Sequence, residues 1–147
     1  MPYDRLIKTN RIKQHQASQK EINQLLQLAK RDLMTATRNL EDAPDWAYSI
    51  AYNSILQAGR ALMFHEGFRP RGGEQHATVV EFVEERLGDA YISQVRLFDQ
   101  MRRKRHRVIY ETAGLVSKRE AEQATAFAKD FVESIYEIIT GQSKLGI

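Results

Sequence analysis

The sequence predicts an all-α fold, an antiparallel up-and-down bundle of four long helices with one short helix inserted. Proline is nearly absent from the interior of the chain, with only three in 147 residues. Most glycines stand where a helix would end, and apolar residues recur every three to four positions. No segment alternates apolar and polar residues as a half-buried strand does. A chain of this length suffices for one domain with its own core.

The first two long helices are expected over about residues 19–41 and from Pro44 to Gly67. A capping box, Ser18–Glu21, opens the first, because serine and glutamate then satisfy each other's free amides. The second begins with proline, which is tolerated in a first helical turn. Trp46 and Tyr48, near its start, are interpreted as packing residues. The apolar stripe of the first helix comprises Ile22, Leu25, Leu26, Ala29, Leu33, Ala36 and Leu40.

A short loop over Phe68–Gly73 precedes the remaining helices. The short helix is expected over about residues 75–87, with Gly88 as its terminator. The next helix opens at Asp89 and runs to about Tyr110. A second capping box, Ser117–Glu120, starts the last long helix, which Gly141 closes. Its inward positions are Ala124, Phe127, Ala128, Phe131, Ile135 and Ile138.

These elements define one domain over residues 18–141. A basic arm over residues 1–17 precedes it, and the sequence leaves open whether this arm is ordered or disordered. A short C-terminal tail covers residues 142–147.

The composition excludes several classes of protein. With 42% hydrophobic and 28% charged residues, the chain lies in the globular range rather than the disordered one. It has no cysteine, so disulfide frameworks, thiolate catalysis and cysteine-ligated metals are excluded. The longest apolar runs are three or four residues, too short for a membrane span or a signal peptide. A cytoplasmic protein with no membrane partner is expected.

The distribution of charge is more informative than its total of +3. Residues 1–20 carry five lysines and arginines against Asp4 alone. Met101–Arg107 carries five with no acid, namely Arg102, Arg103, Lys104, Arg105 and Arg107. Such a patch attracts phosphate groups, and the binding weakens with added salt. The alternative is an ordinary solvated helix face.

Most motifs of catalysis and metal binding are missing. The four histidines show no metal-ligand spacing, and no nucleophile elbow or phosphate-binding glycine loop occurs. No metal and no cofactor are therefore expected. His76, at a helix start close to Arg69 and Arg71, is a candidate for lining a ligand cleft, with a partly exposed structural histidine as the alternative.

The basic helix carries the clearest chemistry. At about 100° per residue, Arg102, His106 and Tyr110 share one edge of the helix, and Arg105 lies on the same half. A guanidinium, an imidazole and a phenol gathered on one surface suit recognition of a phosphodiester. The alternative is that His106 and Tyr110 pack at the helix end while the arginines stay in solvent.

Three segments together resemble the HEPN superfamily of helical bundle domains. They are the small-residue helix Ala51–Leu62, the stretch Gly67–Pro70 followed by His76 and Val79-Val80, and the arginine-rich helix that ends in Tyr110. The superfamily signature is an arginine followed, after four to six residues, by a histidine. Arg105 matches the arginine, His106 matches the polar residue that often follows it, and Tyr110 stands in place of the histidine.

The resemblance implies a function and a way of working. Catalytic members are metal-independent endoribonucleases of toxin–antitoxin or defence loci that act as homodimers, with two motifs facing one cleft. Tyrosine at the histidine position departs from this pattern, since a phenol with a pKa of about 10 is a poor base at neutral pH. Several helices also carry apolar residues beyond one stripe, and a dimer interface would bury some of them: Leu28, Tyr52, Leu56, Met63, Phe82 and Ile92.

Three hypotheses follow. In the first, the chain is an RNA-binding, dimeric endoribonuclease with Arg105, His106 and Tyr110 as catalytic residues. In the second, it is a catalytically silent module that binds RNA, a nucleotide, or a partner such as a cognate nucleotidyltransferase or antitoxin. In the third, it is a structural adaptor. Residues expected to contact nucleic acid are Arg102, Arg103, Lys104, Arg107, Arg69, Arg71 and His76.

Overall fold

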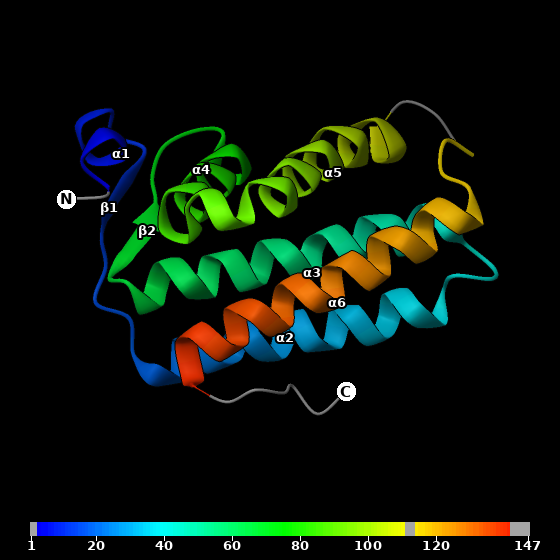
Figure 1. The fold of residues 1–147 in the computed structure, drawn as a ribbon, viewed down its shortest axis with the longest axis horizontal. Coiled ribbons are helices and arrows are strands. Elements are labelled where there is room, and N and C mark those ends of the chain that lie inside the picture. The colour runs from blue at the N-terminus through cyan, green and yellow to red at the C-terminus, as the bar shows by residue number, and fades with distance from the viewer. Residues whose placement is uncertain (1–2, 111–113, 142–147) are drawn as a thin grey trace.

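The computed structural model describes residues 3–110 and 114–141, with the backbone alone for Tyr110. The predicted all-α bundle is confirmed (Figure 1). Its four long helices are α2 (Gln19–Arg38), α3 (Pro44–His65), α5 (Ile92–Tyr110) and α6 (Lys118–Thr140). The shorter elements are α1 (Asp4–Lys8), β1 (Ile12–Gln14), β2 (Phe68–Pro70), α4 (Gln75–Leu87) and the 3₁₀ turn η1 (Asp89–Tyr91).

Both predicted capping serines perform their role. The Ser18 hydroxyl accepts a hydrogen bond from the amide of Glu21, and that of Ser117 accepts one from Glu120, each at 3.1 Å. Helices α2 and α6 therefore begin where the sequence places them. Helix α2 ends at Arg38, a few residues earlier than expected, because the amide of Asn39 bonds back to the last turn and closes it. The helix expected from Asp89 opens with the 3₁₀ turn η1.

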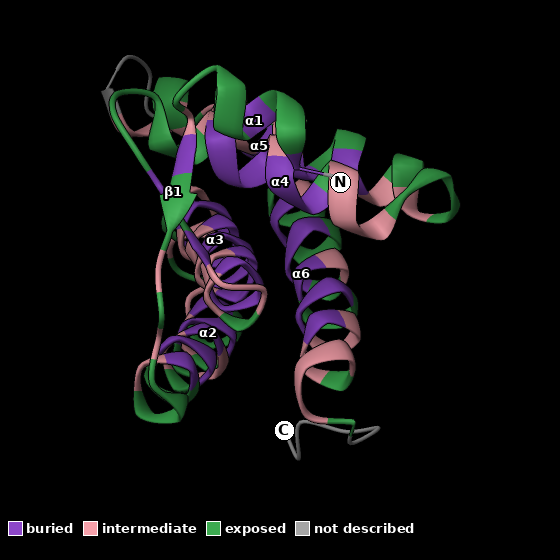
Figure 2. Cartoon of the chain, turned by 90° about the vertical axis from the view of Figure 1, so that its left-hand side faces the viewer, coloured by how far each residue is buried: buried purple, intermediate pink, exposed green. Residues whose placement is uncertain are grey.

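Helix α3 is the centre of the bundle. It contacts α2, α4, α5 and α6, and Figure 2 shows the buried faces of α2, α3 and α6 turned toward one another with α4 and α5 lying across them. Gly59 allows α4 to approach closely, because a Cβ atom there would lie 2.6 Å from Val79 Cγ1. This packing holds the start of α4, which carries His76, beside α3.

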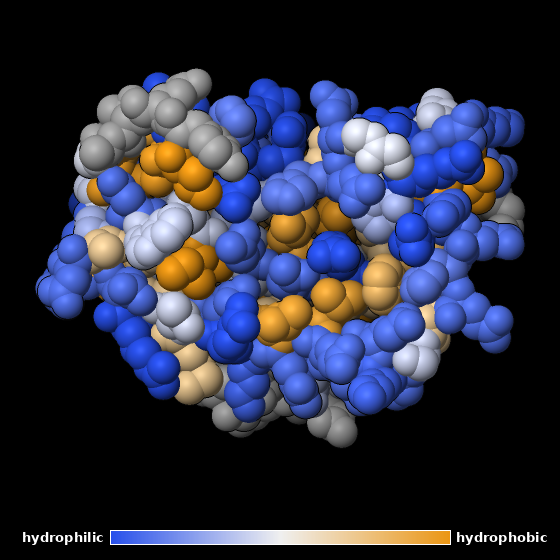
Figure 3. Space-filling model, turned by 180° about the vertical axis from the view of Figure 1, so that it is seen from behind, coloured by the Kyte–Doolittle hydropathy of each residue, from blue (hydrophilic) through white to orange (hydrophobic). Residues whose placement is uncertain are grey.

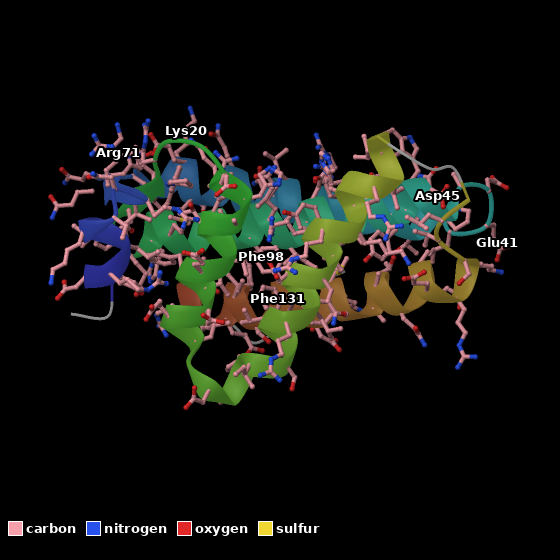
Figure 4. All side chains as sticks on the ribbon, turned by 90° about the horizontal axis from the view of Figure 1, so that it is seen from above. Lys20, Glu41, Asp45, Arg71, Phe98 and Phe131 are labelled. Carbon is pink, nitrogen blue, oxygen red and sulfur yellow. The ribbon has the colours of Figure 1, made fainter. Side chains whose placement is uncertain are left out.

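Helix α5, which carries the basic stretch, is held to the bundle by Phe98. The side chain is fully buried and lies between two other rings, with its centroid 5.9 Å from that of Tyr52 on α3 and 5.7 Å from that of Phe131 on α6. Figure 4 labels Phe98 and Phe131 close to each other near the middle of the bundle. Phe98 thereby fixes the position of α5 relative to both neighbours.

The N-terminal arm, whose order the sequence left open, folds back onto the bundle over its described residues. Strand β1 pairs antiparallel with β2, with Ile12 opposite Pro70. Tyr3, Leu6 and Ile12 join the main core, and the Tyr3 ring stacks on Phe82 at 4.2 Å. The expected absence of strands is thus wrong for this ribbon, because strands of three residues are too short to show alternation. The tail over residues 142–147 lies outside the described part.

Burial corrects two interpretations of the sequence. Four of the apolar residues assigned to a dimer interface, Tyr52, Leu56, Met63 and Phe82, are buried in the chain's own core, whereas Ile92 is exposed. Tyr48 is a packing residue as expected, but Trp46 is 56% exposed. No helix among the described residues has the length and apolar character needed to cross a membrane.

Candidate nucleic-acid interface

Three cations of the basic stretch are held by carboxylates. Asp99, one turn earlier on α5, binds Arg102 at 2.9 Å and Arg103 at 3.0 Å. Lys104 reaches Glu120 on α6 at 2.5 Å. These pairs offset part of the positive charge that the sequence suggests, so the stretch is not a uniform phosphate-binding surface.

Arg105 is placed differently from these three. Its guanidinium lies over the Tyr52 ring, 5.5 Å from the ring centroid. Its Nε atom is buried and has no hydrogen-bond partner among the described residues. A buried donor without a partner is unfavourable, and an anion bound there would satisfy it. Arg105 is therefore the arginine of the stretch best placed to bind a phosphate.

Tyr52 connects Arg105 to His76. Its hydroxyl lies 3.0 Å from His76 Nδ1, while Arg105 lies over its ring. Burial raises the pKa of Tyr52 well above its ordinary value, so the hydroxyl keeps its proton at neutral pH. This neutral hydroxyl either donates to Nδ1 or accepts from it. When it accepts, Nε2 of His76 keeps its lone pair.

The surroundings of His76 favour the neutral imidazole. Partial burial lowers its pKa, and the positive charges of Arg105, Arg60 and Arg102 lower it further. These arginines come from both α3 and α5, so packing gathers three cations around one histidine. We call Tyr52, His76 and these three arginines the cluster. At neutral pH it combines cations that can bind a phosphate with an imidazole that can accept a proton.

A titration followed by NMR is expected to give His76 a pKa below the ordinary value of about 6.5. The contribution of His76 to stability is then complete above about pH 6.5 and is lost as the pH falls to the folded-state pKa, because the unfolded chain binds the proton more readily. Arg105→Ala should raise this pKa by removing the largest single charge effect, whereas Arg96→Ala, on an exposed part of α5, should not. An ordinary or raised pKa in the unmodified protein would contradict the arrangement.

A pocket opens beside Arg105, and His76 does not line it. Its volume is about 540 Å³, and residues of α2, α3 and α5 line it. Asn53 and Gln57, one turn apart on α3, supply amide groups, and Trp46 and Ile109 supply apolar surface. Arg105 therefore lines this pocket and also contacts the ring of Tyr52, which pairs with His76.

The other predicted site residues are more dispersed. His106 and Arg107 are exposed on α5. The side chain of Tyr110 lies outside the described part. Arg69 and Arg71 are exposed at the β1–β2 end of the molecule, where Figure 4 shows Arg71 at the same end as Lys20 and opposite Asp45. They do not line the pocket beside Arg105.

Tyr52 and Arg60 contribute to the cluster, yet the sequence did not single them out. Both belong to the small-residue helix α3, and the sequence indicated Tyr52 only as an apolar residue available to a dimer interface. The ring of Tyr52 contacts Arg105, while its hydroxyl contacts His76. The contact with His76 depends on how α4 crosses α3. No group of three or more histidine and carboxylate side chains able to hold a metal ion occurs in the described ranges.

Comparison with known proteins agrees with the helical architecture. A model of the HEPN domain family matches residues 22–139, which is most of the chain. The search with this chain found no matching curated protein.

Proposed function

Since the chain belongs to the HEPN domain family, we propose that it binds RNA and cleaves it without a metal ion, as a homodimer of the toxin–antitoxin or defence type. The observation that supports this best is the connection of Arg105 to His76 through Tyr52. It joins a phosphate-binding cation to a neutral imidazole, the two groups that cleavage of RNA by its own 2′-hydroxyl requires.

In the proposed reaction, Arg105 holds the scissile phosphate and offsets the charge that grows on it. His76 Nε2 takes the proton of the ribose 2′-hydroxyl while Nδ1–H donates to the Tyr52 hydroxyl. The 2′-oxygen forms a bond to phosphorus as the bond to the 5′-oxygen breaks, and water protonates the leaving oxygen. The products are a 2′,3′-cyclic phosphate and a 5′-hydroxyl.

His106 is the second candidate for the proton acceptor, because it follows Arg105 directly in the sequence. Tyr110 is the third, from its place in the family motif. We favour His76 because its pKa is lowered and because Tyr52 fixes its orientation. In the dimer, Arg105 of each copy would face a shared cleft, so sedimentation should show a dimer under the conditions of cleavage.

The test is to incubate the protein with a mixed RNA in the presence of a chelator, beside His76→Gln and His106→Gln variants. We expect cleavage by the unmodified protein and a loss of about 10²–10⁴-fold in His76→Gln, the usual contribution of a general base. His106→Gln should lose much less. Analysis of the new ends should show cyclic phosphates.

The opposite result has a clear meaning for each variant. If His106→Gln loses activity and His76→Gln keeps it, the assignment of the proton acceptor is wrong. If RNA binds in a salt-dependent way without being cleaved, the chain is the silent module, and its partner becomes the question. If it binds no RNA at moderate salt, the proposed function is wrong altogether.

A further inference from the structure

The pocket beside Arg105 has properties that phosphate binding alone does not require. It lies between α2, α3 and α5, and its volume of about 540 Å³ falls within the range usual for ligand sites, about 300–1,000 Å³. Figure 3 views the molecule from behind relative to Figure 1, and shows apolar side chains gathered in patches within a largely hydrophilic surface. The lining of this pocket combines charged and amide side chains with the apolar Trp46 and Ile109, so a pocket of mixed character adjoins the candidate phosphate site.

Two buried polar groups of this pocket have no partner among the described residues. Ser49 is only 2% exposed, and its hydroxyl has no hydrogen bond. The Nε atom of Arg105 is also buried and has no hydrogen-bond partner there. Unsatisfied buried groups are uncommon in folded proteins, since each loses the hydrogen bonds it had with water. A ligand with polar edges would relieve both after small side-chain rotations.

The remaining lining resembles what a nucleobase requires. Asn53 offers an amide donor and an acceptor, which suits the edge of an unpaired base. Gln57 offers its amide donors, while its Oε1 accepts a hydrogen bond from Arg60 at 3.3 Å. Trp46 is exposed at the rim, and aromatic rings of this kind stack on the faces of bases. The buried Asp32 lies on the α2 side, where its Oδ1 already accepts hydrogen bonds from the guanidinium of Arg31.

We propose that this pocket holds an unpaired nucleobase of the RNA, next to the phosphate bound by Arg105. The proposal rests on the proposed function, because it takes the phosphate to be that of RNA. The pocket would then give a single-stranded RNA a fixed register, and it would place one chosen phosphate at Arg105. The cleavage site would depend on the base and not only on the backbone.

The experiment compares two oligomers of equal length, both 2′-O-methylated so that neither can be cleaved. One is an oligoadenylate, and the other is the same ribose–phosphate chain without bases. Trp46 is the only tryptophan of the chain, so its fluorescence reports directly on the pocket. Both oligomers should bind, and the affinity of both should fall as salt is added. Only oligoadenylate should quench the fluorescence of Trp46, and it should bind about tenfold tighter or more than the abasic oligomer.

Matched variants separate the pocket from the rest of the surface. Asn53→Leu and Gln57→Leu, which keep the side chains similar in size, should abolish the preference for oligoadenylate while the abasic oligomer binds as before. Asn23→Leu makes the same change on an exposed part of α2 outside the pocket and should alter neither.

Each remaining outcome decides the matter. If the two oligomers bind and quench equally, the base pocket is wrong and RNA binding stands. If neither oligomer binds, the proposed function itself fails. If Trp46 emission follows protein concentration and ignores the oligomers, a second copy of the chain covers the pocket, and the inference is wrong.

Discussion

Arg105→Ala is expected to lower the rate of RNA cleavage by about 10²–10³-fold, the usual loss when one charge-stabilising donor is removed from a reaction centre. The guanidinium has two tasks in the proposed site. It neutralises the phosphate, and its charge helps to keep His76 unprotonated. Removing it affects both the anchor and the proton acceptor.

The same variant should also change how RNA binding depends on salt. A lost phosphate contact reduces the slope of log affinity against log salt by about one. Arg105→Lys keeps the charge but loses the planar group that lies over the Tyr52 ring, so it should restore the salt dependence without restoring the cleavage rate. Filter binding over a salt series and a cleavage time course measure the two effects separately.

Arg96→Ala is the matched control, because it removes an exposed arginine from the same helix. Its cleavage rate should stay close to that of the unmodified protein. Equal losses in the two variants would show that the net charge of α5 matters rather than the position of Arg105. Full activity in Arg105→Ala would remove it from the site.

Local features of this chain were predictable from the sequence because their causes are local. Ser18 and Ser117 cap helices through bonds to residues three positions away, and the apolar stripes face the core as their spacing indicates. The end of α2 was misplaced because Leu40 continues the apolar pattern past the residue where the backbone closes. The apolar pattern thus continues for about one turn beyond the last hydrogen-bonded residue of the helix.

The candidate site was only partly predictable, because its properties depend on residues far apart in the sequence. The sequence identified the basic helix, but Lys104 is paired with Glu120 on another helix. The location of Arg105 over Tyr52, and of His76 against the same ring, follows from how α4 and α5 cross α3. No spacing rule within one helix contains that information.

Trp46 is a residue for which the local pattern led to a wrong prediction. An isolated tryptophan near a helix start usually packs, and Tyr48, two residues later, does so. At the start of α3, however, Asp45 holds the chain that leads into α6 by accepting hydrogen bonds from the amides of Gly114 and Val116. The indole is left at the rim of the pocket, where it has no role in the core.

Phe98→Ala should be the most destabilising single change in the helix that carries Arg105, at about 3–5 kcal/mol. Its ring is fully buried and contacts Tyr52 on α3 and Phe131 on α6, so its removal leaves a cavity between three helices. Denaturant unfolding followed by circular dichroism measures the loss. The neighbouring Leu97→Ala truncates a side chain that is 44% exposed, and it should change stability by no more than about 0.5 kcal/mol.

A milder substitution tests whether Phe98 positions Arg105 as well as stabilising the fold. Phe98→Leu keeps most of the apolar volume and should cost less than about 1.5 kcal/mol, so it stays folded under assay conditions. It should nevertheless weaken the Arg105-dependent part of RNA binding, because the ring of Phe98 packs against the same Tyr52 that Arg105 covers. Unchanged binding in Phe98→Leu, together with a loss below about 1 kcal/mol in Phe98→Ala, would show that α5 is positioned by other contacts. In that case Val95 and Met101, which are buried on the described part of α5, would have to hold the basic helix in place.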